Sequence, residues 1–513
     1  MKVLGTPLGS PEYVAQQLHE IRTEHETLLH ALQALPELQS SWLLLSLCAS
    51  TRANYYLRAL PPSQSRVFAA SHDEAILRTL RTLLDSPGGE DEDLLWASAV
   101  AHLPMRMGGL GLRSAARMAP AAYWASWADC LHMIRGRHPT LANLFVRALS
   151  EGAAVEQCLR ELQESHALLH GEGFRESPNW EQLADGARPQ QVAEIVREPG
   201  EWTHGWQFFA AGARDEFARA DMLLQRGARS ATAALLRSQS GPCGGKVFTV
   251  LPTSSLTTIP SAEVRVLLLR RLHLPIPMTA QHCRCRGVLD ARGHHRAACA
   301  TCGFLRRRAR PLEKAAARMC REARARVAEN VLMRDMNLLG ISGHDSRQIE
   351  VVANGLPLWH GAQLAVDTTM VSPVRRDGTP QPGAGTGDGV QLAEARRRKE
   401  RKYRELLQER RCRLVVVALE VGGRWGEEAV TFVRLLAKAK ARSAPELLRP
   451  AVTAAYFHRW TGLLAVAAQR AFAATLLELP VDGAEAVDGD PPVLEDVLLD
   501  ARLVEPPVPI RVL

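Results

Sequence analysis

The segment "RQIEVVANGLPLWHGAQLAVDTTM" (residues 347–370) decides the fold expected for the C-terminal half of the chain. Two short apolar runs rich in β-branched residues flank an Asn-Gly dipeptide, a pattern typical of two antiparallel strands joined by a turn. Each run carries one carboxylate, Glu350 in the first and Asp367 in the second. Because successive side chains of a strand alternate between its faces, both acids leave the apolar side of their strands. A hairpin would therefore bring the two carboxylates together on one side of a sheet.

A third apolar run, "RLVVVALEVGGRW" (residues 413–425), predicts another strand beside this pair and offers Glu420 as a further acid. Carboxylate oxygens are the ligands that Mg²⁺ prefers, and such sites support metal-assisted hydrolysis of phosphodiesters. We therefore interpret Glu350 and Asp367 as candidate catalytic magnesium ligands. Lys399 and Lys402, in a basic segment further along the chain, are candidates to stabilise the negative charge of the transition state. The alternative is that the two acids simply face solvent.

Composition and periodicity divide the rest of the chain. Apolar residues recur at helical spacing through most of the first 237 residues, and a stretch rich in Ser, Gly, Pro and Thr follows. The fold class expected is α+β, with a mostly helical N-terminal half and tail and a small mixed α/β domain. The predicted regions are a helical one at 1–237, a linker with a short helix at 238–281, a Cys/His segment with a basic helix at 282–335, the α/β domain with its helical tail at 336–480, and a flexible tail at 481–513.

The chain of 513 residues carries 63 Lys and Arg against 55 Asp and Glu, a formal net charge of +8. This basic balance is modest but unevenly distributed, which favours an acidic partner such as nucleic acid. Ten cysteines, most of them scattered singly, are atypical of a secreted disulfide framework. The N-terminus lacks the pattern of a signal peptide, and the longest uninterrupted apolar runs are too short to span a membrane. We expect an intracellular protein without a membrane partner.

A cluster of four cysteines and two histidines occupies the segment "CRCRGVLDARGHHRAACATC" (residues 283–302). Thiolates and neutral imidazoles are the usual ligands of tetrahedral Zn²⁺, and a structural zinc site needs four of them. The spacing differs from that of common C-x-x-C fingers, because one residue separates the first two cysteines. The ligands expected are Cys283, Cys285, His295 and Cys299, with His294 and Cys302 as alternatives. The other interpretation is a reduced loop that binds no metal.

A long basic helix is predicted directly after this cluster. Residues 303–326 contain nine Lys and Arg against two acids, and residues 396–413 contain ten against three. On the first helix an apolar stripe lies opposite several of the basic residues, so one side is expected to pack and the other to contact phosphates or water. The candidate nucleic-acid contacts are Arg307, Arg310, Lys314, Arg318, Arg321 and Arg397. A solvated basic face is the alternative.

The order of these parts resembles the C-terminal portion of non-LTR retrotransposon reverse-transcriptase proteins of the class that carries a restriction-like endonuclease. "KVLGTPLGSPEYV" is similar to the segment that follows the polymerase palm, and "CASTRANYYLRALPP" with "LPMRMGGLGLRSAARMAPAAYWASWAD" is similar to the thumb and connector. The family continues with a Cys/His knuckle, a basic helix and a nuclease of the PD-(D/E)xK type, and this order covers residues 2–480. No Tyr/Phe/Ala-x-Asp-Asp polymerase motif occurs in the chain.

The resemblance implies residue roles and a function. Glu350 and Asp367 match the family's metal-binding acids, while Lys399, Lys402 and Tyr403 match its Lys-x-x-Lys-Tyr element. The expected protein binds DNA, and element RNA as a further partner, in the nucleus. It would nick DNA with Mg²⁺ as catalytic cofactor and Zn²⁺ as structural cofactor, and it would not polymerise. The alternative is a catalytically inactive nucleic-acid-binding or interaction module from a truncated element.

Overall fold

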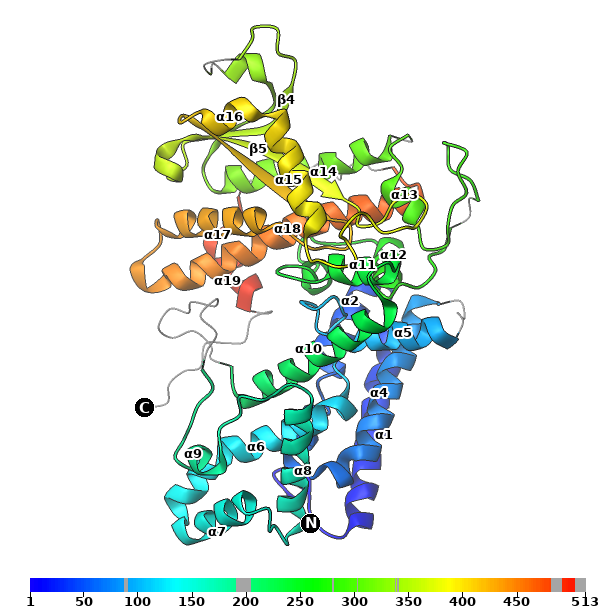
Figure 1. Cartoon of the computed structure of the whole chain (residues 1–513), viewed down its shortest axis with the longest axis vertical. Helices are drawn as coiled ribbons and strands as arrows, with labels where there is room; N and C mark the ends of the chain where they lie inside the picture. The colour runs from blue at the N-terminus through cyan, green and yellow to red at the C-terminus, as the bar shows by residue number, and fades with distance from the viewer. Residues whose placement is uncertain are drawn as a thin grey trace.

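The computed structural model describes residues 1–86, 91–190, 204–278, 281–301, 303–336, 338, 341–480 and 491–502. Helices dominate this part of the chain, together with one four-stranded sheet of mixed direction and a small two-stranded ribbon. The N-terminal helices occupy one end of an elongated molecule and the sheet occupies the other (Figure 1). The α+β class predicted from the sequence is confirmed.

The helical half is built around α6 (Ala115–Arg137). This helix packs against α3 (Asn54–Ala59), α4 (Pro62–Leu84), α8 (Gln157–Gly171) and α10 (Trp206–Arg226). Its central position explains why its sequence is rich in alanine, since small side chains let several helices approach closely. The other elements of this half are β1 (Lys2–Val3), β2 (Thr6–Pro7), α1 (Pro11–Gln33), α2 (Leu38–Leu44), α5 (Asp91–His102), α7 (Pro139–Ser150), α9 (Trp180–Ala184) and α11 (Ala231–Gln239).

The sheet has the strand order β3-β4-β5-β6. The neighbours β3 (Arg326–Leu332), β4 (Gln348–Asn354) and β5 (Gln363–Val371) are antiparallel, whereas β6 (Cys412–Glu420) runs parallel to β5. The predicted hairpin and the third strand beside it are therefore present. The edge strand β3 was not predicted, because its exposed polar residues hide the alternation that marks a half-buried strand.

Helices cover both faces of the sheet. On one face lie α14 (Phe304–Glu322) and α17 (Glu427–Ala441), whose apolar residues share a cluster with Val351 and Val366 of the sheet. The other face carries the connection from β5 to β6, with α15 (Val390–Lys402) and α16 (Arg404–Gln408). A parallel pair needs a crossover of this length, which explains why basic helices sit beside the strands.

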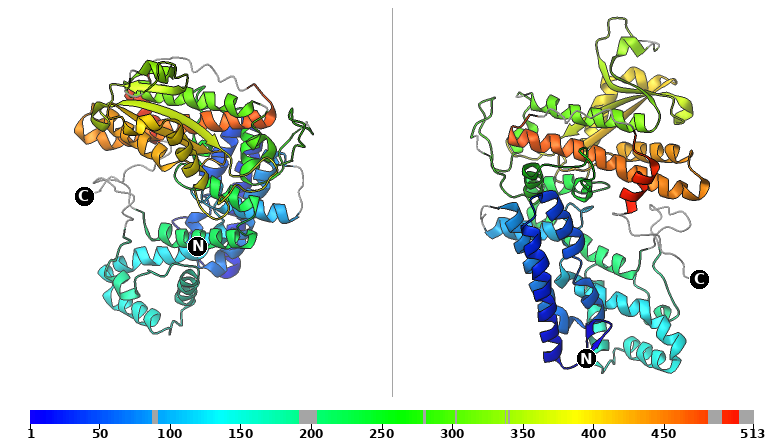
Figure 2. Two further views of the ribbon diagram at one scale, coloured as in Figure 1. Left: turned by 45° about the horizontal axis from the view of Figure 1, so that its top comes forward. Right: turned by 180° about the vertical axis from the view of Figure 1, so that it is seen from behind.

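The helix α18 (Arg449–Leu477) lies between the sheet and the N-terminal helices (Figures 1 and 2). Within residues 446–477 it is apolar and long enough to cross a membrane, but 83% of its most apolar window is buried inside the protein. It packs against α12 (Ser261–Arg271), α14 and α17. The apolar residues of α18 are therefore part of the hydrophobic core.

A single hydrophobic cluster crosses the predicted region boundaries. It includes Leu29 of α1, Leu267 of α12, Trp460 of α18 and Ala501 of α19 (Leu494–Arg502). The regions predicted from composition thus share one core, and their boundaries stay a prediction. The tail predicted as flexible contains α19, which packs on α18, while residues 481–490 and 503–513 lie outside the described part of the chain.

Candidate functional site

The two predicted acids lie on neighbouring strands and on the same face of the sheet. The β4–β5 register pairs Val351 with Val366, and one further step places Glu350 opposite Asp367. The main-chain N–H of Thr368 donates a hydrogen bond of 2.5 Å to Oε2 of Glu350. This contact ties the Glu350 carboxylate to the backbone beside Asp367. The hairpin therefore brings the two carboxylates together, as the residue pattern predicts.

Lys399, in the last turn of α15, reaches this pair of acids. Its Nζ forms an ion pair with Oδ1 of Asp367 and lies 4.0 Å from Oε1 of Glu350. Asp367 is fully buried, and a buried carboxylate is tolerated when a cation or hydrogen bonds compensate it. Its Oδ2 atom is buried without a hydrogen-bond partner among the described residues. One acceptor of the site thus lacks a hydrogen-bond donor among the described residues.

The charges of the site shift the pKa of Glu350. Burial and, next, the negative charge of Asp367 raise this pKa to about 7, although the positive charge of Lys399 opposes the shift. Near neutral pH the Glu350 carboxyl is therefore divided between its protonated and ionised forms. A cation placed between the two acids, in addition to Lys399, would favour the ionised form of Glu350.

Lys402 contributes differently from Lys399. Its Nζ lies over the ring of Tyr403, 4.6 Å from the ring centroid, and burial lowers its pKa. The Tyr403 hydroxyl is close to Asp367, yet it donates its hydrogen bond of 2.6 Å to the main-chain oxygen of Gln348. Lys399 is thus the lysine in direct contact with the acids, while Tyr403 fixes the end of α15 against β4.

One acid near the site was missed. Burial and the negative charge of Asp367 raise the pKa of Glu313, which lies on α14. In the sequence, Glu313 stands out as one of two acids in a basic helix. Only the packing of α14 on β5 shows that Glu313 lies near Asp367. Glu420, in contrast, lies at the far end of β6, where Val371 is its partner in the register. Glu420 is therefore not part of the site around Asp367.

The Cys/His cluster forms a compact group of four ligands. One ligand atom from each of Cys283, Cys285, His295 and Cys299 lies within 4.8 Å of the others, so these residues could hold a metal such as zinc. The separation between Sγ of Cys285 and Nε2 of His295 is 3.1 Å. A Cβ at Gly287 would lie 2.4 Å from Cε1 of His295, so the turn requires glycine.

The surroundings of the cluster select one of the two histidines. The carboxylate of Asp290 accepts hydrogen bonds from the main-chain N–H groups of His294 and His295, which begin α13 (His294–Ala298). The imidazole of His294 contacts Nη1 of Arg270 at 3.0 Å, and this ring is not part of the four-ligand group. The other alternative ligand, Cys302, lies outside the described residues.

A buried arginine joins this cluster to the sheet. Nη1 of Arg308 donates to the main-chain oxygen of Ala297, and Nη2 donates to that of Met370 in β5. Arg308 is 2% exposed, so its guanidinium has a structural role. The Cys/His cluster is therefore anchored to the strand that carries Asp367.

No family model matches this chain, and no curated protein matches it. The retrotransposon resemblance therefore stays a prediction.

The predicted nucleic-acid contacts fall into two groups. The arginines Arg318, Arg321 and Arg397 form ion pairs with Glu322, Glu329 and Glu394, respectively. Arg310 is exposed and Lys314 is half-buried, and neither forms an ion pair within the part of the chain that the structure describes. Arg307 is exposed near the start of the same helix. The basic residues of α14 without an ion pair among the described residues are therefore centred on Arg310 and Lys314.

Proposed function

We propose that this chain is a retrotransposon-derived nucleic-acid-binding protein whose sheet domain is a Mg²⁺-dependent DNA endonuclease of the PD-(D/E)xK type. The observation that carries the proposal is the convergence of Glu350, Asp367 and Lys399 on one face of the sheet. Two carboxylates and one lysine are the groups that phosphodiester hydrolysis requires in such a site. DNA, with element RNA as a further partner, and a nuclear location belong to the same proposal.

The residues present fit a magnesium ion. The unpartnered Oδ2 of Asp367 and the neighbouring Glu350 carboxylate offer hard oxygen ligands. When bound, Mg²⁺ would polarise a phosphate oxygen and lower the pKa of a bound water. Glu350 would release its proton on cation binding, and Lys399 would turn from Asp367 toward the phosphate and stabilise its developing negative charge. Tyr403 would hold the end of the lysine-bearing helix in place.

Zinc would have a separate, structural role in this proposal. Cys283, Cys285, His295 and Cys299 supply four ligands and leave no position for a reacting water. Because Arg308 joins the adjacent helix to β5, an ordered cluster would position the basic helix α14 relative to the acids. The zinc site would thereby orient bound DNA toward the candidate catalytic residues.

A second candidate function is a nucleic-acid-binding module without catalysis. The observation that favours it is the direct ion pair between Lys399 and Asp367, since the lysine already neutralises the buried acid. Thr369 also occupies the position where simple PD-(D/E)xK enzymes have lysine. In that case the acids and Lys399 would contribute to stability alone.

Nicking of supercoiled plasmid separates the two candidates. We expect the wild-type protein to nick plasmid when Mg²⁺ is added, and Asp367→Asn to lower the rate by about a hundredfold or more. The matched control is Asp377→Asn, because Asp377 is exposed in the loop before α15 and should not affect cleavage. Thermal unfolding checks that each variant folds. DNA binding without nicking by the wild type, or equal nicking by Asp367→Asn, would favour the inactive module.

A further inference from the structure

A second polar centre lies where the helical half meets the sheet domain. It borders a cleft of about 960 Å³. The walls come from the segment after α5, from α10, from α11 and the segment after it, from the loop before α15 and from the turn that follows β6. None of the candidate catalytic residues lines this cleft. Its chemistry therefore needs its own explanation.

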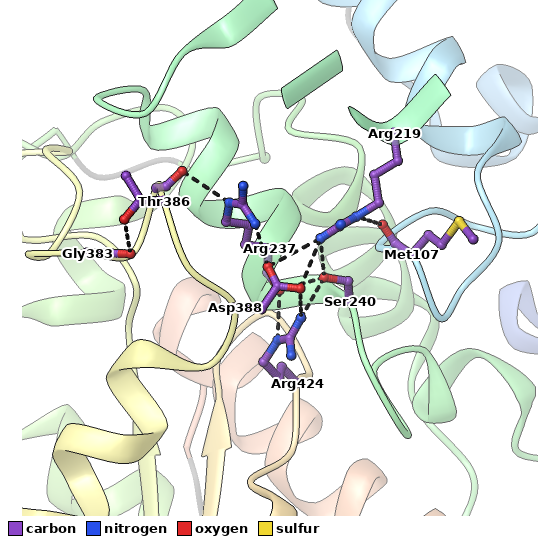
Figure 3. A network of polar contacts seen from close by, with 9 residues as sticks. Met107, Arg219, Arg237, Ser240, Gly383, Thr386, Asp388 and Arg424 are labelled. Carbon is purple, nitrogen blue, oxygen red and sulfur yellow. Dashed lines mark hydrogen bonds and ion pairs between the residues drawn. The ribbon is translucent and has the colours of Figure 1, made fainter. Parts of the chain in front are cut away.

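Three arginines converge on one carboxylate in this cleft. Asp388 accepts hydrogen bonds of 3.3 Å from Arg219, 2.8 Å from Arg237 and 2.8 Å from Arg424. The hydroxyl oxygen of Ser240 also accepts from Arg219 and Arg424. Figure 3 shows the Asp388 carboxylate between these guanidinium groups. The arginine side chains are only 11–21% exposed, so their orientation is fixed by the surrounding structure.

The cleft carries more positive than negative charge. Arg106 is a fourth arginine on its wall, and the acids that line it are Asp388 and Glu216. Among the described residues, Nη1 of Arg219 and Nη2 of Arg237 have no hydrogen-bond acceptor. Two preorganised N–H donors next to an exposed arginine form a site for an oxyanion, because guanidinium groups bind phosphate oxygens in this geometry.

The helix α15 connects the cleft to the candidate catalytic lysine, Lys399. Asp388 precedes Gly389, the N-cap residue of α15, and Lys399 lies in the last turn of that helix. Lys399 is the tenth residue of α15, so it lies about 14 Å along the helix from Val390. The cleft and the candidate catalytic lysine therefore lie at opposite ends of α15.

We propose that this cleft is a second phosphate-binding site, which takes a backbone phosphate of the bound nucleic acid between Arg106, Arg219 and Arg237. The inference rests on the proposed nucleic-acid binding, but it does not require cleavage. Asp388 holds the arginines in position when nucleic acid is absent, and its negative charge opposes the incoming phosphate. Removing that charge should therefore strengthen binding, whereas removing an arginine should weaken it.

Fluorescence anisotropy with a labelled single-stranded oligonucleotide tests this proposal, in buffer without added divalent cations. We expect Arg106→Gln to weaken the affinity by about threefold to tenfold and to reduce the slope of log affinity against log salt by about 0.7. Arg106 is exposed and forms no ion pair within the described residues, so this variant should fold. Asp388→Asn should bind at least about twofold more tightly than the wild type.

The matched control is Arg147→Gln on α7, whose side chain is 75% exposed and pairs with Glu151. Equal affinities for Arg106→Gln and Arg147→Gln, or weaker binding by Asp388→Asn, would overturn the cleft as a phosphate site. ADP tests whether the cleft binds the phosphate of a free nucleotide instead. Displacement of the oligonucleotide by micromolar ADP would overturn the assignment of the cleft to nucleic acid. If the wild type binds no oligonucleotide, the proposed function itself fails, which is a distinguishable result.

Discussion

The substitution Glu322→Gln tests whether the basic helix α14 is held in place by a buried carboxylate. Glu322 is 3% exposed and accepts hydrogen bonds from Arg318, from both Nε and Nη2 of Arg459, and from the indole of Trp460. Burial alone would raise the pKa of Glu322, but hydrogen bonds and charge from Arg459, with help from Trp460 and Arg318, hold the pKa below its ordinary value. This carboxylate therefore joins the end of α14 to α18.

The cost of losing this charge follows from the geometry. Glutamine keeps the shape of the side chain but removes the buried carboxylate that pairs with Arg318 and Arg459, and breaking such a buried pair destabilises a protein by about 3 kcal/mol. With a urea dependence of about 3 kcal/mol per molar, the unfolding midpoint should fall by roughly 1 M. Urea titration followed by circular dichroism measures this shift.

The control is Glu329→Gln, which removes the partner of Arg321 at the end of the same helix. The two side chains of that pair are 41% and 32% exposed, so the loss should be below about 1 kcal/mol. The pH dependence has a defined sign. Because the folded pKa of Glu322 lies below the unfolded value, its stabilisation is present above the unfolded pKa of 4.5 and is lost as the pH falls through the folded pKa. Equal midpoints for the two variants at pH 7 would refute the reasoning.

Three further predictions concern the candidate sites. Cys299→Ser should abolish retention of one zinc per chain and lower the thermal midpoint, whereas Cys130→Ser, an exposed cysteine outside the cluster, should retain the metal; atomic absorption and calorimetry check both. Because the pKa of Glu350 is raised to about 7, Mg²⁺ affinity measured by titration calorimetry should be about tenfold weaker at pH 6 than at pH 8, and Glu350→Gln should remove this dependence. Arg310→Ala should weaken duplex DNA binding and reduce the salt slope by about 0.9 without altering stability, while Arg318→Ala should lower stability because Arg318 pairs with Glu322; anisotropy and thermal unfolding separate the two effects.

The sequence by itself determined the local features of the candidate site. Alternation in the segment that contains Glu350 and Asp367 predicted a hairpin with both acids on one side, since strand side chains have a period of two and a hairpin turn sets the register. The helical stripe of α14 was equally readable, and its Leu312, Ala316 and Met319 are buried. The four ligands Cys283, Cys285, His295 and Cys299 lie close together in sequence, so their grouping needed little tertiary information.

Only the tertiary structure decided which charged residues are available. Arg308 resembles Arg310 in sequence, yet it is buried and donates to Met370 of β5, 62 residues away. Arg318 pairs with Glu322 one turn along the same helix, but contacts from Arg459 and Trp460 of α18 hold that carboxylate in place. The same applies to Glu313 beside Asp367, and to Arg237 and Arg424, which meet at Asp388 although they are 187 residues apart in the chain. Periodicity records only which side of an element faces the core. The partner that meets that side is set by how the whole chain packs.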